Sequence, residues 1–367
     1  MLIFFIERRL IMRVKHLTLL ILSSIFLLTA CGNNSQLYTT STEPEETLSS
    51  SSSTKEESTS EQQTLDSDLL SETNSDSSEE ENSSKDSTSS EAPTAATAAT
   101  TTDGQTLPVE AQSAILYNCT DGIILASKNE ENLVYPGSTA KLMTALLAVE
   151  HVPLDTIITV GDELDLVKPH SSLAYIQKGH QLTMQMLLEG SLIPSGNDAS
   201  YTIAATVGRI IAEDDTLDAE EAVNTFVQAM NEKAQELGMR HSTFTTPDGF
   251  DDSKQLVTAS DMAILSAEFM KHSELLDMTR IHRMDATFVS GEMVTWTNTN
   301  HLLDPENEYY ISDCIGLKTG SSEYSGYCII SGYEYNGKQY AIIVMNGARD
   351  GRWNDTHILY DYMKTLS

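Results

Sequence analysis

Three short strings, far apart in the chain, together carry the groups that an acyl-transfer reaction needs. They are Ser138-Thr139-Ala140-Lys141, Ser195-Gly196-Asn197 and Lys318-Thr319-Gly320. A serine hydroxyl is a weak nucleophile until a neighbouring base takes its proton. Residues three apart share one face of a helix, so Lys141 would stand beside Ser138. Burial or a second cation such as Lys318 lowers a lysine pKa and lets the amine act as a base. The strings therefore predict a serine–lysine site.

Each string alone also has a simpler interpretation. Ser138 and Lys141 could be a helix cap and a surface lysine, and the Ser-x-x-Lys spacing recurs by chance at residues 52–55. The surrounding pattern separates the functional copy from the chance one. Ser138 follows a Pro-Gly break and opens an apolar run, Ser195 lies at a helix break, and Lys318 ends an apolar strand. The order of all three strings favours a common site.

The elements that must position these residues can be predicted from periodicity. Apolar residues between 142 and 149 indicate a helix that is buried on most sides, and two helices at 183–193 and 198–211 are interrupted at 194–197. Strand patterns occur at both ends of the region, with Asp-Gly and Asn-Gly turns that are typical of hairpins. The predicted strands are 112–118, 123–127, 286–290, 293–298, 314–319, 327–335 and 339–345, and the further helices are 219–237, 260–272 and 354–366. This order predicts an α+β fold in which terminal strands form one antiparallel sheet of about five strands with helices packed on it.

The residues around the strings identify a family. Pro136-Gly137-Ser138, Ser195-Gly196-Asn197-Asp198-Ala199, Thr299-Asn300-His301-Leu302-Leu303 and Gly316-Leu317-Lys318-Thr319-Gly320 resemble the serine D-alanyl-D-alanine carboxypeptidases. These are the low-molecular-weight penicillin-binding proteins of peptidase family S11, and the three-string set is typical of penicillin-binding proteins and serine β-lactamases. The resemblance covers about residues 107–366. It implies a β-lactamase/DD-peptidase-like fold with a helical subdomain, and removal of the terminal D-alanine from peptidoglycan pentapeptides.

The resemblance also implies a role for each residue. Ser138 is the nucleophile and Lys141 its base, Ser195 relays a proton, and Asn197 contacts the substrate or orients Lys141. Lys318 and Thr319 hold the terminal carboxylate, and the backbone N–H groups of Ser138 and Ser321, next to Gly320, form the oxyanion hole. An arginine that helps to bind the carboxylate is assigned to Arg349, with Arg352 as the alternative. Positions where many relatives have histidine hold Ser321 and Asp248, so no histidine is given a role.

Two other functions stay open at this stage. A serine β-lactamase of the same fold usually has a Glu-x-x-Leu-Asn loop for deacylation, and this string is absent from the sequence. Stable acylation by β-lactam antibiotics is expected instead. A non-catalytic, penicillin-sensing wall-binding module would not need an intact Ser138, Lys141 and Lys318. No cofactor is predicted, and the nine histidines show no metal-binding spacing.

The N-terminal part of the chain predicts export. A basic start at residues 13–15 is followed by an apolar run and by Leu28-Thr29-Ala30-Cys31, which resembles a bacterial lipobox. We therefore expect a lipoprotein signal peptide at 1–30, with Met1 or Met12 as the true start, and a lipid on Cys31. An uncleaved membrane-anchor helix is the alternative. The lipid would hold the protein on the outer face of the cytoplasmic membrane of a Gram-positive bacterium.

Composition divides the remainder of the chain in two. Residues 32–103 carry 16 acidic residues and 2 lysines in a Ser/Thr-rich background, so 31–106 is predicted to be a disordered tether and 107–367 the catalytic domain. Residues 104–367 retain a net charge of −21, which argues against nucleic acid as a partner. Cys119, Cys314 and Cys328 are expected to be free thiols, although a Cys314–Cys328 pair on neighbouring strands stays open.

Overall fold

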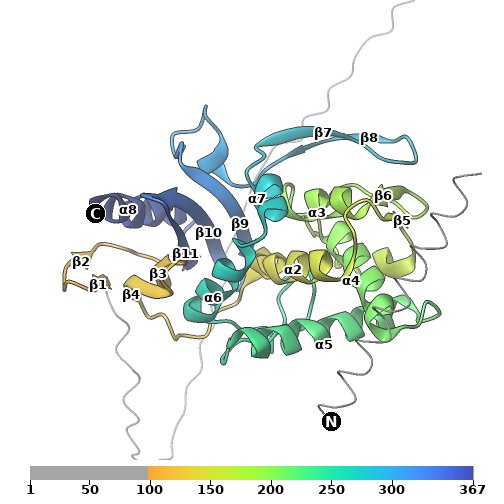
Figure 1. Ribbon diagram of the computed structural model, residues 1–367, viewed down its shortest axis with the longest axis horizontal. Helices are drawn as coiled ribbons and strands as arrows, with labels where there is room; N and C mark the ends of the chain where they lie inside the picture. The colour runs from red at the N-terminus through yellow and green to blue at the C-terminus, as the bar shows by residue number, and fades with distance from the viewer. Residues whose placement is uncertain (1–97, 367) are drawn as a thin grey trace, which may run out of the picture. The chain divides into compact units, whose positions relative to one another are not determined.

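The computed structural model describes residues 98–366, and the predicted signal peptide, the Cys31 lipobox and most of the predicted tether lie outside these residues. The centre is a seven-stranded, fully antiparallel sheet in the order β2-β1-β4-β3-β11-β10-β9 (Figure 1). Its strands are β1 (Ala99–Thr101), β2 (Thr106–Leu107), β3 (Ser113–Asn118), β4 (Ile123–Lys128), β9 (Cys314–Ser322), β10 (Gly326–Tyr335) and β11 (Lys338–Gly347). Strands from both ends of the described chain therefore meet in one sheet, as the sequence predicted.

Helices cover both faces of this sheet. One face carries α8 (Gly351–Thr365), and the other carries α6 (Ala259–Phe269) and the helical subdomain behind it (Figure 1). That subdomain contains α2 (Lys141–His151), α3 (Met184–Leu192), α4 (Asn197–Ala212), α5 (Ala219–Leu237) and α7 (Ser273–Thr279). Two small hairpins pair β5 (Ile157–Thr159) with β6 (Gln181–Thr183) and β7 (Arg283–Thr287) with β8 (Met293–Thr297). The 3₁₀ turns are η1 (Gly137–Ala140), η2 (Asp162–Leu166) and η3 (His301–Leu303). The predicted α+β class, an antiparallel sheet flanked by helices, is confirmed, and the sheet has seven strands where about five were predicted.

Alternate side chains of the central strands belong to two hydrophobic cores, one on each face of the sheet. In β11, Ala341, Ile343 and Met345 belong to the cluster on the helical side, whereas Ile342 and Val344 belong to the cluster beneath α8. Successive side chains of a strand point to opposite faces, so a strand that is apolar throughout must be covered on both. This is why β11 lies in the interior of the sheet, between β3 and β10.

Local capping fixes several helix ends. Asp218 and Glu221 form a reciprocal capping box at the start of α5, which ends before Gly238 at a φ of +86°. The cap at the start of α6 is not reciprocal. Thr258 does accept from the Asp261 N–H, but the Asp261 carboxylate accepts from the N–H groups of residues 240 and 241 instead of returning to Thr258. The Asp261 side chain therefore connects the segment that follows α5 to the first turn of α6.

Two sequence predictions need correction, whereas the expectation of free thiols is confirmed for the described cysteines. The predicted boundary at 106 is displaced, because residues 99–107 form two short edge strands of the main sheet. The predicted strands 286–290 and 293–298 correspond to a separate hairpin, β7–β8. Its first strand, Arg283–Thr287, begins earlier in the chain than predicted. A Cys314–Cys328 disulfide is excluded by register, since Cys314 lies opposite Tyr333 and Cys328 opposite Gly320, and all three described cysteines are free.

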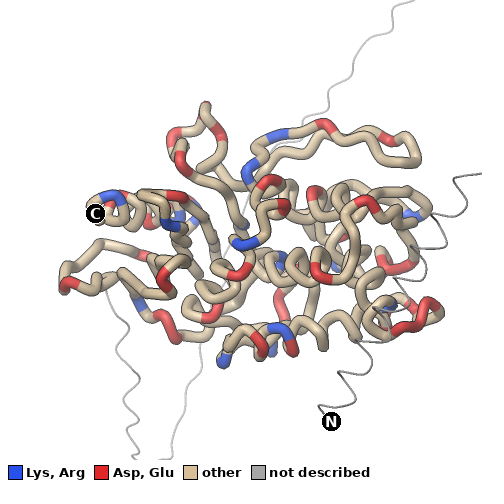
Figure 2. The backbone as a smooth tube through the Cα atoms, in the orientation of Figure 1, with Lys and Arg blue, Asp and Glu red and all other residues tan. Residues whose placement is uncertain are grey.

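Charge is distributed over the described surface. Figure 2 shows acidic residues on most elements of residues 98–366, with fewer basic residues between them. Within this part of the chain no helix is long and apolar enough to cross a membrane.

Candidate active site

The nucleophile and its base lie on one turn of chain. Ser138 stands in η1, directly after Pro136-Gly137, and Lys141 is the first residue of α2. The three-residue spacing brings Lys141 Nζ to 2.8 Å from Ser138 Oγ. Ser138 is half-buried, whereas Lys141 is fully buried. The predicted serine–lysine juxtaposition is therefore present in the structure.

Lys141 is held by groups that can only accept hydrogen bonds from it. Its Nζ donates to Asn197 Oδ1 and to the Asp248 carbonyl oxygen, each at 2.8 Å. A neutral amine has two N–H groups and one lone pair. With both N–H groups directed at these acceptors, the lone pair can face only the Ser138 hydroxyl. The geometry thus orients the amine to receive the serine proton.

Burial also tunes the base. It lowers the pKa of Lys141 to about 8, and the negative charges of Asp248 and Asp198 oppose the shift. The Asp248 carboxyl group is itself buried. Its Oδ1 accepts from the Phe250 N–H, and its Oδ2 has no partner among the described residues. Asp248 therefore supports the site in two ways, through a backbone carbonyl and through an adjacent charge.

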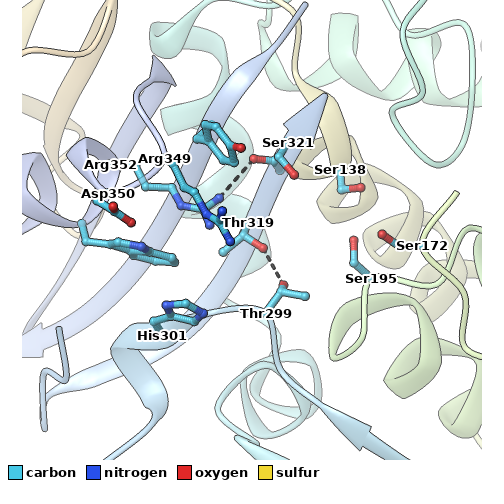
Figure 3. Close-up of a pocket in the computed structure, with 13 residues that line it drawn as sticks. Ser138, Ser172, Ser195, Thr299, His301, Thr319, Ser321, Arg349, Asp350 and Arg352 are labelled. Atoms are coloured by element: carbon cyan, nitrogen blue, oxygen red, sulfur yellow. Dashed lines mark hydrogen bonds between the residues drawn. The ribbon is translucent and has the colours of Figure 1, made fainter. Parts of the chain in front are cut away.

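The second string closes the site from the α3–α4 connection. Ser195 is almost fully buried and has a φ of +66°, a rare conformation for a residue other than glycine. Figure 3 shows its side chain beside Ser138 and Ser172. Asn197 Nδ2 donates to Ser171 Oγ at 2.9 Å, which leaves Oδ1 directed at Lys141. The positive φ and this clamp place both polar side chains next to the nucleophile.

Asp198 holds the loop that covers this wall. Its carboxylate accepts from the N–H groups of Ala174, Ile176 and Ala199 at 2.8–3.1 Å. Burial raises its pKa, and the backbone hydrogen bonds work in the opposite direction. The sequence analysis assigned Asp198 no role beyond its place in the Ser195–Ala199 motif. Its structural function depends on the 174–176 loop, which no sequence spacing links to it.

The third string forms the opposite wall on β9. Thr319 is joined to Thr299 through their hydroxyl oxygens, 2.5 Å apart (Figure 3). Gly320 packs directly on η1, because a Cβ there would lie 3.0 Å from the Ser138 nitrogen. Lys318 is buried beneath the surface, and its Nζ donates to the Thr319 carbonyl at 3.0 Å. Burial, aided by the charges of Lys141 and Arg352, holds its pKa well below the usual value.

A cleft of about 440 Å³ extends from Ser138 along this wall. We call its far end the cationic arm, lined by Thr299, His301, Thr319, Arg349 and Arg352 (Figure 3). Both candidate arginines face it. Arg349 is exposed, whereas the Arg352 guanidinium lies 4.2 Å from the Trp353 ring and donates to the carbonyls of Gly320 and Cys328 at 3.4 and 3.5 Å.

A second cavity, of about 420 Å³, extends from Ser138 in the other direction. We call it the acidic arm, lined chiefly by Phe250, Asp251, Ser322, Glu323 and Tyr324. Two segments meet there, because Ser322 Oγ donates to Asp251 Oδ1 at 2.6 Å. Ser138, Ser172 and Ser321 belong to both cavities, so a bound chain could pass the nucleophile and occupy both arms.

The structure thus brings Ser138, Lys141, Ser195, Asn197, Thr319, Gly320, Ser321 and Arg349 to one cleft, with Lys318 beneath it. Sequence reasoning missed Ser172 and the acidic arm, for which no spacing gave a signal. His301 was given no role, yet it lines the cationic arm and stacks on Trp353 with ring centres 4.9 Å apart. The motif that begins at Thr299 and includes His301 was the one sequence feature that could have indicated this position.

Fold and site together define a serine acyl-transfer protein in which lysine takes the place of histidine. The family model for D-alanyl-D-alanine carboxypeptidases, peptidase S11, matches residues 97–349. The chain belongs to this family, as the resemblance predicted.

Individual relatives agree with this assignment. D-alanyl-D-alanine carboxypeptidase DacF of Bacillus subtilis is 30% identical over 244 residues, which cover 65% of this chain and 58% of DacF. The chain thus spans less than two thirds of that relative. The enzyme of Streptomyces sp. strain K15 is 30% identical over 63% of this chain and 78% of its own.

Solved structures give the same picture. The crystal structure of the Streptomyces K15 DD-transpeptidase superposes with a TM-score of 0.64 at 27% identity, over 70% of this chain and 97% of that one. Ampicillin-bound penicillin-binding protein D2 from Listeria monocytogenes gives 0.56 at 27% identity, over 68% of this chain and 96% of that one.

Proposed function

We propose that this protein is a serine D-alanyl-D-alanine carboxypeptidase that removes the terminal D-alanine from peptidoglycan pentapeptides. One observation carries the proposal. Ser138 Oγ lies 2.8 Å from a buried lysine amine whose lone pair can face only that hydroxyl, at the mouth of an arm that carries two arginines. Such an arm suits a substrate whose leaving residue ends in a free carboxylate.

Acylation uses these groups in a fixed order. Neutral Lys141 accepts the Ser138 proton as Oγ attacks the carbonyl carbon of the penultimate D-alanine. The N–H groups of Ser138 and Ser321 stabilise the negative oxygen that develops. The C–N bond then breaks, and Ser195 relays the proton from Lys141 to the departing amine of the terminal D-alanine. The products are free D-alanine and an ester on Ser138.

Deacylation reverses the proton movement. Lys141, again neutral, takes a proton from a water molecule that attacks the ester carbonyl, and Ser138 recovers its hydroxyl proton as the shortened peptide leaves. A β-lactam would also acylate Ser138, through opening of its ring C–N bond, and this ester should hydrolyse slowly because the sequence lacks the glutamate loop expected for rapid hydrolysis. β-Lactam antibiotics are therefore proposed as acylating ligands.

In the cationic arm we assign the carboxylate to Thr319 and Arg352, with Arg349 at the rim. Arg352 is the better placed arginine because Trp353 and two carbonyls fix its guanidinium beside Gly320. Lys318 lies below the strand, where its Nζ donates to the Thr319 carbonyl, and makes no contact at the cleft surface. This changes the expectation that Lys318 itself holds the carboxylate.

The proposed activity is tested with two substrates on the purified protein. Diacetyl-Lys-D-Ala-D-Ala should release D-alanine, and a fluorescent penicillin should leave a long-lived label, and both signals should disappear in Ser138→Ala. Rapid penicillin hydrolysis without D-alanine release would instead indicate a β-lactamase. If neither signal appeared, a non-catalytic module would be the remaining function.

We also propose that a lipid on Cys31 anchors the protein to the outer face of the cytoplasmic membrane. The support is the lipobox-like string after a basic and apolar leader. Several acyl chains anchor a protein stably, whereas one binds only marginally. In cells of a Gram-positive host, Cys31→Ser should release the protein or leave its leader uncleaved, while Cys119→Ser should stay in the membrane fraction. A Cys31→Ser protein that is still cleaved before residue 31 and still found in the membrane fraction, as Cys119→Ser is, would contradict the proposal.

A further inference from the structure

The two arms that meet at Ser138 have opposite charge. The cationic arm carries Arg349 and Arg352 against a single carboxylate, that of Asp350. The acidic arm carries Asp251 and Glu323, and the described residues that line it include His170 but no lysine or arginine. The protein has an acidic net charge, so one more acidic surface patch would mean little by itself. This pair of carboxylates is different because it lies in a cavity that opens onto the nucleophile.

The proposed function, on which this inference rests, fixes what must enter the acidic arm. The leaving D-alanine points its carboxylate into the cationic arm. The acyl part of the peptide must then leave Ser138 in the other direction, and the shared residues Ser138, Ser172 and Ser321 join that direction to the acidic arm. One residue spans about 3.5 Å of extended chain. The side chain that precedes the D-Ala-D-Ala unit therefore falls within this cavity.

The walls of the acidic arm indicate the chemistry of that side chain. Phe250 and Tyr324 are unusually exposed for their size, at 36% and 60%, and Tyr324 packs on Tyr135 with ring centres 5.6 Å apart. Aromatic faces bind the methylene chain of a long side chain and also attract a cation. Carboxylates beside them add charge complementarity. Together these features suit an alkyl chain that ends in an ammonium group.

The acidic arm is also held in place by its own contacts. Asp251 accepts from Ser322 Oγ at 2.6 Å and from the Tyr324 N–H at 3.4 Å, so it fixes the β9–β10 turn against the 249–251 segment. A carboxylate has lone pairs for more than two donors and keeps acceptor capacity after these bonds. Glu323 stands exposed in the same turn. One carboxylate is thus preorganised and the other is free to adjust.

We infer that the acidic arm is a specificity subsite for the free side-chain ammonium of a diamino residue immediately before D-Ala-D-Ala. The protein would then distinguish stems with a free amine from stems whose amine has been acylated, as it is in a crosslink. Asp251 and Glu323 determine this specificity, while Phe250 and Tyr324 contact the methylene chain.

Two peptides that differ by one acetyl group test the subsite. Nα-acetyl-Lys-D-Ala-D-Ala keeps the ε-ammonium, whereas the Nα,Nε-diacetyl peptide lacks it. The wild-type protein should show a kcat/KM for D-alanine release about twofold to fivefold higher for the free amine, the range that partly exposed ion pairs support. The preference should decline at high salt because solvent-exposed charges are screened.

Charge-neutral variants locate the effect. Glu323→Gln combined with Asp251→Asn, which keeps the acceptor for Ser322, should make the two peptides equivalent. Glu334→Gln, on the exposed face of β10 and outside both arms, is the matched control and should keep the wild-type preference. Acylation by benzylpenicillin, which has no ammonium group, should be unchanged in Glu334→Gln, and a fluorescent penicillin that still labels the double variant at Ser138 reports that its site is folded.

The outcomes separate the subsite from the activity. Equal kcat/KM for the two peptides in the wild type, or a preference that survives in the double variant, would overturn the subsite and leave the carboxypeptidase activity intact. If no D-alanine were released from either peptide, the proposed activity would fail and the subsite with it.

Discussion

At the scale of single residues, the site depends on a lysine that is kept ready to accept a proton. Lys141 cannot exchange its hydrogen-bond partners with water because it is completely buried. Asn197 and the Asp248 carbonyl take its two N–H groups, and the serine receives the lone pair. The same burial that lowers the pKa of the amine also selects its orientation. Protonation state and geometry are therefore fixed by one environment.

The rate of Ser138 acylation should follow the titration of Lys141. The neutral base becomes more abundant as the pH rises through about 8, so acylation by benzylpenicillin should accelerate over that interval. Removing the Asp248 charge removes a group that raises this pKa. Asp248→Asn should therefore move the midpoint to lower pH, while exposed Asp252→Asn should not. Rates of acylation between pH 6 and 10 measure both effects, and a midpoint that moved upward would contradict the assignment.

The two arginines of the cationic arm should differ in their effect on the peptide reaction. Arg352→Ala should lower kcat/KM for D-alanine release by about tenfold to a hundredfold, the loss expected for a charge-assisted hydrogen bond. Arg349→Ala, at the exposed rim, should cost about fivefold or less. Steady-state kinetics on the same tripeptide compare them. The reverse order would assign the carboxylate to Arg349.

At the scale of elements, the site depends on backbone segments that touch without side chains between them. The 246–250 loop lies against the Gly137 carbonyl, and β9 lies against the start of η1 at Gly320. Glycine permits these contacts because it has no Cβ. The position of the nucleophile is thus set by packing of one turn between a loop and a strand.

Gly249→Ala and Gly238→Ala provide a matched test of this packing. Both glycines have a φ near +85°, so each substitution should cost about 1 kcal/mol for the left-handed conformation. Only at Gly249 would the new Cβ also meet backbone, 1.8 Å from the Gly137 carbonyl oxygen, whereas the space around Gly238 is open. Gly249→Ala should therefore lose about 2 kcal/mol more in urea unfolding and acylate more slowly. Equal losses in both variants would argue against the close contact.

At the scale of the whole molecule, the cleft lies where the sheet meets the helical subdomain. Each of its walls comes from a different region of the chain: η1 and α2, the α3–α4 connection, the 246–251 loop, and β9 with the start of α8. Short strings that carry the chemistry were predictable because a few neighbouring residues specify them. The two arms were not, since residues 250–251 meet residues 322–324 only in the folded chain. The roles of Arg349 and Arg352 could not be separated from the sequence either, because they depend on the first turn of α8, where Arg352 stacks on Trp353.

The edge strands were missed for a related reason. Residues 98–107 continue the Thr-rich composition of the predicted tether, and only their pairing with β4 reveals a structural role. A fragment that begins at 107 should therefore be less stable than one that begins at 98. It loses the buried Ala99 and Thr101 and the hydrogen bonds to β4, a difference of about 1–3 kcal/mol in the free energy of unfolding. Urea titrations of the two fragments check this, and identical midpoints would restore the boundary predicted from composition.

The order of strands has a further consequence for when the protein becomes active. β3 pairs with β11, so residues 113–118 must wait for residues 340–345 before the sheet can close. Pairings of such long range form slowly, and a chain made from its N-terminus cannot complete this one until synthesis is almost finished. Ser138 and Lys141 are made early, but the wall opposite them and both arginines come from the last strands and α8. A partly made chain therefore contains Ser138 and Lys141 but not the complete cleft. The growing polypeptide should not catalyse acyl transfer until its last strands and α8 have been made.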